Sequence, residues 1–271
     1  MNVPSSQPIA AFDLDLREAL LREMILVAGD MALDGFTGRT LETTSMKGVQ
    51  DFLTETDGAV ENYLRDRIAA AFPADGFLGE ESGHTSGNHL WVADPIDGTA
   101  NFARGIPHFC ISIAFVANAE VELGAIYNPG LDELYFARRG RRATRNGKPI
   151  QVASTTDFDR ACVEFGWSPR IPTPVYLDAM SAILTLGANV RRGASGALGL
   201  AFVADGRSDA YAELHMNPWD CLAGLLMVTE AGGVTAPFLD RDGLASGGAV
   251  LASCPGIAEG ISKATGIPLD A

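Results

Sequence analysis

One segment, Asp94-Pro-Ile-Asp-Gly-Thr-Ala-Asn-Phe102, constrains the fold of this chain most strongly. The apolar run before it, residues 89–93, contains an aromatic and a β-branched residue and predicts a buried strand. Asp94 and Asp97 would then leave the strand end on one tight turn, where two carboxylates repel each other unless a cation lies between them. Hard divalent cations such as Mg²⁺ take oxygen ligands, so the segment favours a metal site; an ordinary solvent-exposed turn is the alternative.

Gly98 and Thr99 follow the two acids directly. Glycine lets the backbone approach a ligand closely, and the amides at this point could open a helix that faces an anion. Thr99 could equally be a turn residue that satisfies its own backbone. The segment therefore combines a possible cation site with a possible anion site.

Two further segments carry acids in comparable settings. One is Asp51-Phe-Leu-Thr-Glu-Thr-Asp57, which is followed later in the chain by Gly79-Glu-Glu-Ser82. The other is Asn217-Pro-Trp-Asp220, which is followed by Glu230-Ala-Gly-Gly233. With these segments in this order, the chain resembles the inositol monophosphatase family of lithium-sensitive, Mg²⁺-dependent phosphatases, from about Lys47 to Gly233. The superfamily also holds fructose-1,6-bisphosphatases, adenosine 3′,5′-bisphosphate phosphatases and some histidinol phosphatases. The resemblance implies an α+β fold, a layered α-β-α-β-α sandwich.

The resemblance also implies a metal-binding role for several of these residues. Asp94 would bridge two metal ions, with Glu80 and the Ile96 carbonyl completing the first site. Asp97 and Asp220 would complete the second site. A third, weaker Mg²⁺ could bind near Glu80, so the resemblance implies two or three ions per active site. Glu80 could instead be a surface acid, and Asp220 could cap the helix that follows it.

The same resemblance identifies residues for catalysis and substrate binding. Thr99 and Asp57 match the pair that orients the attacking water, so the predicted catalytic residues are Glu80, Thr99 and Asp57. Glu213 matches the position that contacts ring hydroxyls in inositol-preferring members. The predicted substrate contacts are Asp97, Gly98, Thr99, Ala194, Ser195 and Glu213. Two departures from the family pattern are Ala194, where glycine is usual, and Lys47, which lies four residues before Asp51 rather than five.

Length and charge narrow the organisation and the partners. A chain of 271 residues can form one large domain or two packed halves; we expect an N-terminal half, 1–150, with most metal ligands and a C-terminal half, 151–271, with Asp220 and the substrate contacts. A net charge of −14 repels nucleic acid and anionic membranes. Four scattered cysteines, no apolar stretch of membrane-spanning length and no signal-like start favour a reduced, cytoplasmic protein.

Hydrophobic periodicity predicts the main elements. Helices are expected over residues 13–33, with a stripe including Leu16, Leu20, Met24 and Val27, over 58–72, capped by Asp57, and over 220–230. A loop is expected over 35–47. Strands are expected over 109–116, 121–127, 132–137, 161–165, 209–214 and 249–253.

Together these features predict a Mg²⁺-dependent phosphatase that acts on a small phosphate ester and forms a homodimer. Inositol monophosphate is the first substrate candidate, and we expect it to react faster than adenosine 3′,5′-bisphosphate, because Glu213 disfavours extra negative charge. Histidinol phosphate, fructose 1,6-bisphosphate and a nucleotide or NADP phosphate stay open. A binding or regulatory role is the alternative from another class, because some bacterial relatives contact the transcription machinery; the carboxylate set argues against it as the sole role.

Overall fold

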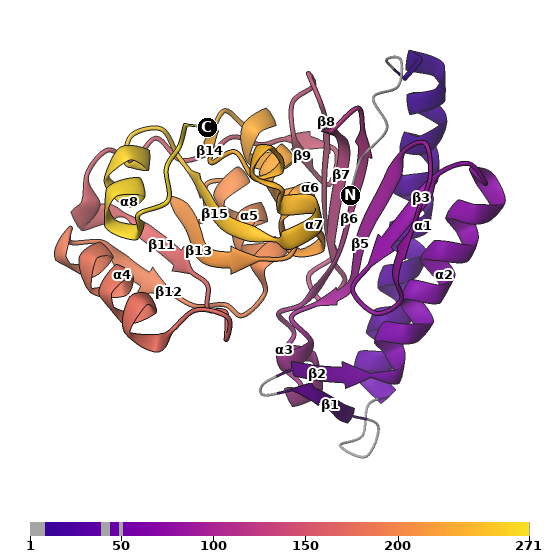
Figure 1. The fold of residues 1–271 in the computed structure, drawn as a ribbon, viewed down its shortest axis with the longest axis horizontal. Coiled ribbons are helices and arrows are strands. Elements are labelled where there is room, and N and C mark those ends of the chain that lie inside the picture. Colours follow the sequence, from indigo (N-terminus) through magenta and orange to yellow (C-terminus); the bar gives the residue numbers. More distant parts are fainter. Residues whose placement is uncertain (1–8, 39–43, 49–50, 271) are drawn as a thin grey trace.

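The structure, a computed structural model that describes residues 9–38, 44–48 and 51–270, stacks helices and sheets in five layers (Figure 1). Two long helices pack on one face of a large sheet, two helices lie between this sheet and a smaller one, and two more cover the far face of the smaller sheet. In that order the pairs are α1 (Ala11–Gly38) with α2 (Glu55–Ala71), α5 (Gly196–Ala204) with α6 (Pro218–Glu230), and α4 (Thr173–Thr185) with α8 (Ala258–Thr265). The predicted α-β-α-β-α sandwich is confirmed.

The large sheet has the strand order β10-β9-β8-β7-β6-β5-β3-β4, and β3 and β5 are its parallel pair. Its strands are β3 (Gly76–Gly79), β4 (Gly83–Thr85), β5 (Leu90–Asp97), β6 (Cys110–Ala117), β7 (Glu120–Asn128), β8 (Glu133–Arg138), β9 (Thr144–Arg145) and β10 (Lys148–Pro149). Every residue of β5 and β6 is buried, since helices cover both faces of the sheet. The hairpin expected from 109–116 and 121–127 is confirmed as β6 and β7.

The small sheet has the order β12-β11-β13-β15-β14 and mixes parallel with antiparallel pairs. Its strands are β11 (Cys162–Phe165), β12 (Asn189–Arg191), β13 (Ala210–Met216), β14 (Val234–Thr235) and β15 (Gly248–Ser253). The strands expected near 161–165, 209–214 and 249–253 are confirmed. Two further helices, α3 (Thr99–Arg104) and α7 (Gly243–Ser246), are short. A division into halves at residue 150 stays a prediction.

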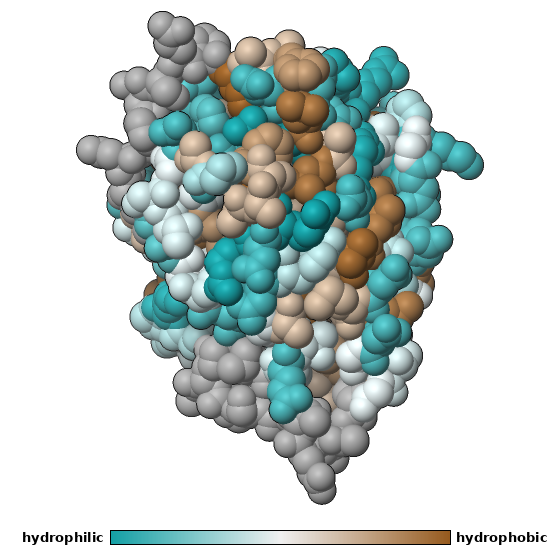
Figure 2. Space-filling model, turned by 90° about the vertical axis from the view of Figure 1, so that its right-hand side faces the viewer, coloured by the Kyte–Doolittle hydropathy of each residue, from teal (hydrophilic) through white to brown (hydrophobic). Residues whose placement is uncertain are grey.

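Helix α1 exceeds its expected bounds and buries a different stripe from the one expected. Leu20 and Met24 are buried as expected, but Leu16 is 46% and Val27 39% exposed. The face turned to the core instead includes Leu21 and Ile25. Figure 2 shows the molecular face on the α1 and α2 side, where brown side chains are interrupted by teal ones. Such an interrupted face does not by itself identify a dimer contact, so the homodimer stays a prediction.

The loop expected over residues 35–47 is wrong at both ends. Helix α1 continues to Gly38, and Thr44–Gly48 forms strand β1, which pairs antiparallel with β2 (Asp51–Thr54). Threonine-rich sequence favours extended backbone, which competes with the loop interpretation. Residues 39–43 and the side chain of Lys47 lie outside what the structure describes. None of the described helices is long and apolar enough to cross a bilayer.

Candidate active site

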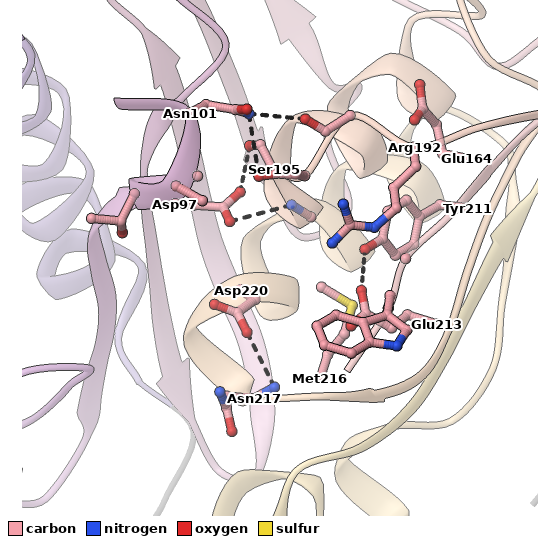
Figure 3. A pocket seen from close by; sticks show the side chains of 18 of the residues that line it. Asp97, Asn101, Glu164, Arg192, Ser195, Tyr211, Glu213, Met216, Asn217 and Asp220 are labelled. Atoms are coloured by element: carbon pink, nitrogen blue, oxygen red, sulfur yellow. Dashed lines mark hydrogen bonds between the residues drawn. The ribbon is translucent and has the colours of Figure 1, made fainter. Parts of the chain in front are cut away.

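A cleft of about 990 Å³ opens where residues from both sheets converge. Figure 3 shows its walls, with Asp97 on one side and Glu213 with Tyr211 on another. Eight of the predicted site residues line it: Glu80, Asp97, Gly98, Thr99, Ala194, Ser195, Glu213 and Asp220. The structure therefore brings together acids that lie far apart in the sequence.

Two of these acids, Asp97 and Asp220, form a compact cluster with Asp94 at the inner end of the cleft. One carboxylate oxygen from each of Asp94, Asp97 and Asp220 lies within 4.8 Å of the others. The strand was expected to end before Asp94, but β5 runs on to Asp97, and its register with β6 shifts between the two acids. Residues three apart on a regular strand point to opposite faces, so this shift between the two acids lets both carboxylates approach one point.

Asp94 and Asp220 face mainly other acids. Asp94 is 2% exposed, and burial raises its pKa well above the ordinary value, as do the nearby charges of Glu80, Asp97 and Asp220. Burial, Asp97 and Glu80 likewise raise the pKa of Asp220 well above its ordinary value. The two carboxyl groups lie close together, so without a cation the fold favours a proton on at least one of them. A cation can replace that proton and neutralise both groups.

Asp97 has a different environment, because the protein supplies donors for its charge. Its Oδ2 accepts hydrogen bonds from Ser195 Oγ at 2.6 Å and from the Ala197 amide at 2.7 Å, and its Oδ1 accepts one from the Gly196 amide at 3.2 Å. These donors form the N-terminus of α5, where the helix dipole also favours a negative charge. Burial raises the pKa of Asp97, while these hydrogen bonds oppose the rise.

Thr99 and Asp57 meet at the side of the cluster. Thr99 Oγ1 lies 2.9 Å from the Ile96 carbonyl oxygen and 3.4 Å from Asp57 Oδ1, so its single proton can turn to either acceptor. Asp57 is not the N-cap of α2, as expected, but its third residue; Thr54 is the cap, and Asp57 accepts its backbone amide at 2.9 Å. Burial raises the pKa of Asp57 to about 6, although the Thr54 hydrogen bonds oppose the rise.

Glu80 lies in the turn between β3 and β4, and a residue missed in the sequence holds that turn. Glu61 of α2 is 1% exposed, and its carboxylate accepts the Glu81 amide at 2.8 Å and the Ser82 amide at 2.6 Å. A Cβ on Gly79 would come within 2.3 Å of the Glu61 carboxylate, so the turn needs glycine there. The signal available in the sequence was an acid inside the buried stripe of a helix, beside Val60.

Hydrogen bonds join the loop before α5 to helix α3. Asn101 Nδ2 donates to the carbonyl of His108 at 2.8 Å and to that of Gly193 at 2.9 Å. Ala194 has φ 59°, in the left-handed region where glycine is favoured, which explains why glycine is usual at this position of the family pattern and means that alanine is strained there. Asn101 lies within the segment 94–102, but nothing in that segment indicates that its side chain would donate to backbone carbonyls of other loops.

Glu213 lies on β13 at the outer wall of the cleft. Its Oε2 accepts a hydrogen bond from Tyr211 Oη at 2.5 Å, and burial raises its pKa to about 7. Arg192 lies near enough to oppose that rise, and Figure 3 shows its guanidinium reaching into the cavity above the Tyr211–Glu213 bond. The two arginines of residues 191–192 gave no indication in the sequence that one of them would face the cleft.

The donor set at the inner end suits a hard divalent cation. Every candidate ligand is an oxygen, and the Ile96 carbonyl keeps a second lone pair beside its bond to Thr99. Three carboxyl groups within 4.8 Å of one another carry, when ionised, a local excess of negative charge that a cation would balance. The acid cluster could therefore hold metal.

Comparison with known proteins gives a consistent result. The inositol monophosphatase family matches residues 13–265. An inositol-1-monophosphatase of Mesorhizobium japonicum is 34% identical over 263 residues, covering 94% of this chain and 99% of that protein. The Nus factor SuhB of Xylella fastidiosa is 40% identical over 200 residues, 72% of each chain. The crystal structure of the extragenic suppressor protein SuhB from Bartonella henselae, 29% identical, superposes with a TM-score of 0.84 over 92% of this chain and 97% of that one.

Proposed function

The chain belongs to the inositol monophosphatase family and is a phosphoric monoester hydrolase, and we propose that it uses Mg²⁺ to hydrolyse inositol monophosphate and related esters. The observation that carries the metal proposal is the convergence of Asp94, Asp97 and Asp220 within 4.8 Å in a cleft large enough for a small ester. Lithium sensitivity, a homodimer and a cytoplasmic location belong to the same proposal and rest on the family resemblance.

The residues that would hold the metal come from the end of a strand, the first turn of a helix and one supported turn. Asp94, Asp97 and the Ile96 carbonyl come from the end of β5, Asp220 from the first turn of α6, and Glu80 from the turn that Glu61 holds. When bound, Mg²⁺ supplies charge neutralisation for the ester and raises the acidity of a water molecule. Because the ligands lie on paired strands and helix termini, their spacing is set before substrate arrives.

Thr99 and Asp57 would orient the attacking water. The Thr99 hydroxyl donates to Asp57, which leaves the threonine oxygen free to accept a hydrogen bond from that water. Asp57 is fully buried, and its pKa of about 6 brings it near the range in which a carboxylate can accept a proton at neutral pH. Gly98 and Thr99 line the cleft at the start of α3, and their amides would contact the phosphate oxygens.

The leaving alcohol would occupy the outer part of the cleft, between the loop at Ala194 and Ser195 and the wall at Glu213. A buried carboxyl with Tyr211 as its donor leaves one oxygen for a hydroxyl of the alcohol. This contact supports a polyol as the leaving group.

Release of inorganic phosphate from a panel of esters, with Mg²⁺, with Ca²⁺ and with chelator, tests the proposal. We expect turnover of inositol monophosphate with Mg²⁺, little with Ca²⁺, whose coordination is larger and looser, and none with chelator. Millimolar lithium should inhibit. Equal turnover in chelator would refute the metal role, and no turnover of any ester with Mg²⁺ would refute the substrate class.

A further inference from the structure

The outer cleft holds two arginines that form no ion pair with an acid in the described part of the chain. Arg170 lies in the loop after β11 and Arg192 directly follows β12, and both line the cleft. Neither guanidinium makes a hydrogen bond or an ion pair with a residue in 9–38, 44–48 or 51–270. The adjacent Arg191, in contrast, pairs with the buried Glu164 at 3.0 Å. Two neighbours in sequence thus have opposite environments, one paired and one open to a ligand.

Arg192 is exposed, and its side chain extends over the open part of the cleft. Its guanidinium carbon lies 5.8 Å from the centre of the Trp167 ring, and Figure 3 shows the group extending toward the cavity centre near Tyr211 and Glu213. An aromatic ring beside an arginine limits its rotation and leaves the outer edge of its planar fork free. Such a fork suits two oxygens of one carboxylate or phosphate.

The charge of the cleft therefore reverses along its length. The inner end is negative, while the outer end offers Arg170 and Arg192 against one acid, Glu213, which Tyr211 already contacts. Glu164 does not change this balance, since Arg191 pairs with it. A chain with a net charge of −14 gains nothing for solubility from two unpaired arginines in a cleft.

We propose that Arg192, assisted by Arg170, binds an anionic oxygen group on the alcohol part of the substrate. The inference rests on the proposed phosphatase function and adds, within its substrate class, a preference for esters whose leaving alcohol carries a carboxylate or a second phosphate. A neutral polyol monophosphate would react, but less well. The expectation that Glu213 makes the leaving-group wall acidic is incomplete, because Arg192 extends over the same wall.

Two pairs of esters test this inference, each pair differing in one anionic group. Glucitol 6-phosphate and 6-phosphogluconate differ by a carboxylate, and fructose 1-phosphate and fructose 1,6-bisphosphate differ by a phosphate. The wild type should have the higher kcat/KM on the anionic member of at least one pair, and which pair shows the preference identifies the group. Arg192→Gln should lower kcat/KM for that member by about 10- to 100-fold, the range for a charged hydrogen bond, and change the neutral member by less than about twofold.

Arg142→Gln is the matched control, because it removes the same charge from an exposed position that does not line the cleft. It should leave both members of each pair unchanged. The inference is overturned if the wild type prefers both neutral esters, if Arg192→Gln lowers both members equally, or if Arg142→Gln has the same effect. A wild type that hydrolyses none of the four esters, nor inositol monophosphate, overturns the proposed function instead.

Discussion

The inner and outer ends of the cleft are built on different principles. At the inner end, three acids are held by strand β5 and the first turn of α6. At the outer end, Arg170 and Arg192 are exposed, and their guanidinium groups have no partner among the described residues. The inner end brings together like charges that a bound cation would balance, whereas the outer end would present separate charges to the alcohol. Under the proposed function, the chemistry would take place at the inner end and the choice of substrate would be made at the outer end.

The largest effect on activity is expected from substitutions at the inner end of the cleft. Asp94→Asn or Asp220→Asn should lower kcat by at least about 10³-fold, since each removes a charge that would bind metal without changing volume. Without metal, the same variants should unfold at a higher temperature at neutral pH, because burial and neighbouring acids raise the pKa of both groups and so oppose their ionisation.

Phosphate release in saturating Mg²⁺ and thermal unfolding in chelator provide the two measurements. Asp240→Asn, at an exposed position away from the cleft lining, is the control and should change neither. Turnover close to wild type in either cleft variant would contradict the metal assignment.

The next effect concerns the support of the inner end. Glu61→Gln places an amide NH₂ against one of the two backbone N–H groups that the carboxylate now accepts. We expect a loss of about 1–3 kcal/mol in the free energy of unfolding and a higher Mg²⁺ concentration for half-maximal activity, because the turn with Glu80 is no longer fixed. The exposed Asp66→Asn on the same helix is the control. A variant that loses stability but keeps its Mg²⁺ requirement would show that Glu61 does not position Glu80.

A smaller, pH-dependent effect comes from the outer wall. Burial raises the pKa of Glu213 from 4.5 to about 7. A carboxyl whose folded pKa is raised stabilises the fold fully below its unfolded pKa, and that contribution is lost as pH rises through the folded pKa. Between pH values of about 4.5 and 8, the wild type should lose up to about 3 kcal/mol of unfolding free energy relative to Glu213→Gln.

Urea unfolding of both proteins across this range, in chelator, measures the difference. The same variant should change the ranking of polyol esters, since its amide replaces the hydroxyl-accepting oxygen. Parallel pH curves for the two proteins would show that Glu213 is not buried as an acid.

The smallest effect is at the loop that joins the two ends. Ala194→Gly removes the left-handed strain at φ 59°, but it also gives the unfolded chain more freedom. The net gain should be within about 1 kcal/mol of unfolding free energy, with turnover unchanged within about twofold, because the backbone carbonyl contact with Asn101 is kept. A clear loss of stability would indicate that the Ala194 methyl group packs favourably.

The inner end could be predicted from the sequence because its residues lie in short segments with a fixed order. Asp94, Asp97 and Asp220 all reached one cluster, although the shift in β5 that brings the first two together was not foreseen. Helices α4 and α5 were missed; α5 consists almost entirely of buried apolar residues, so it has no polar face for periodicity to detect. The outer end was not predicted, because the direction of Arg192 depends on strand pairing across the small sheet rather than on neighbours in sequence.

The contacts of Asp97 bear on how the protein is made. Its donors lie 98 to 100 residues further along the chain, at Ser195, Gly196 and Ala197. A growing polypeptide that has emerged only as far as β12 therefore carries Asp94 and Asp97 but neither the helix that neutralises Asp97 nor Asp220. During synthesis Asp94 and Asp97 therefore emerge early, and the residues that complete the site emerge late. Most of the chain must leave the ribosome before the site can assemble.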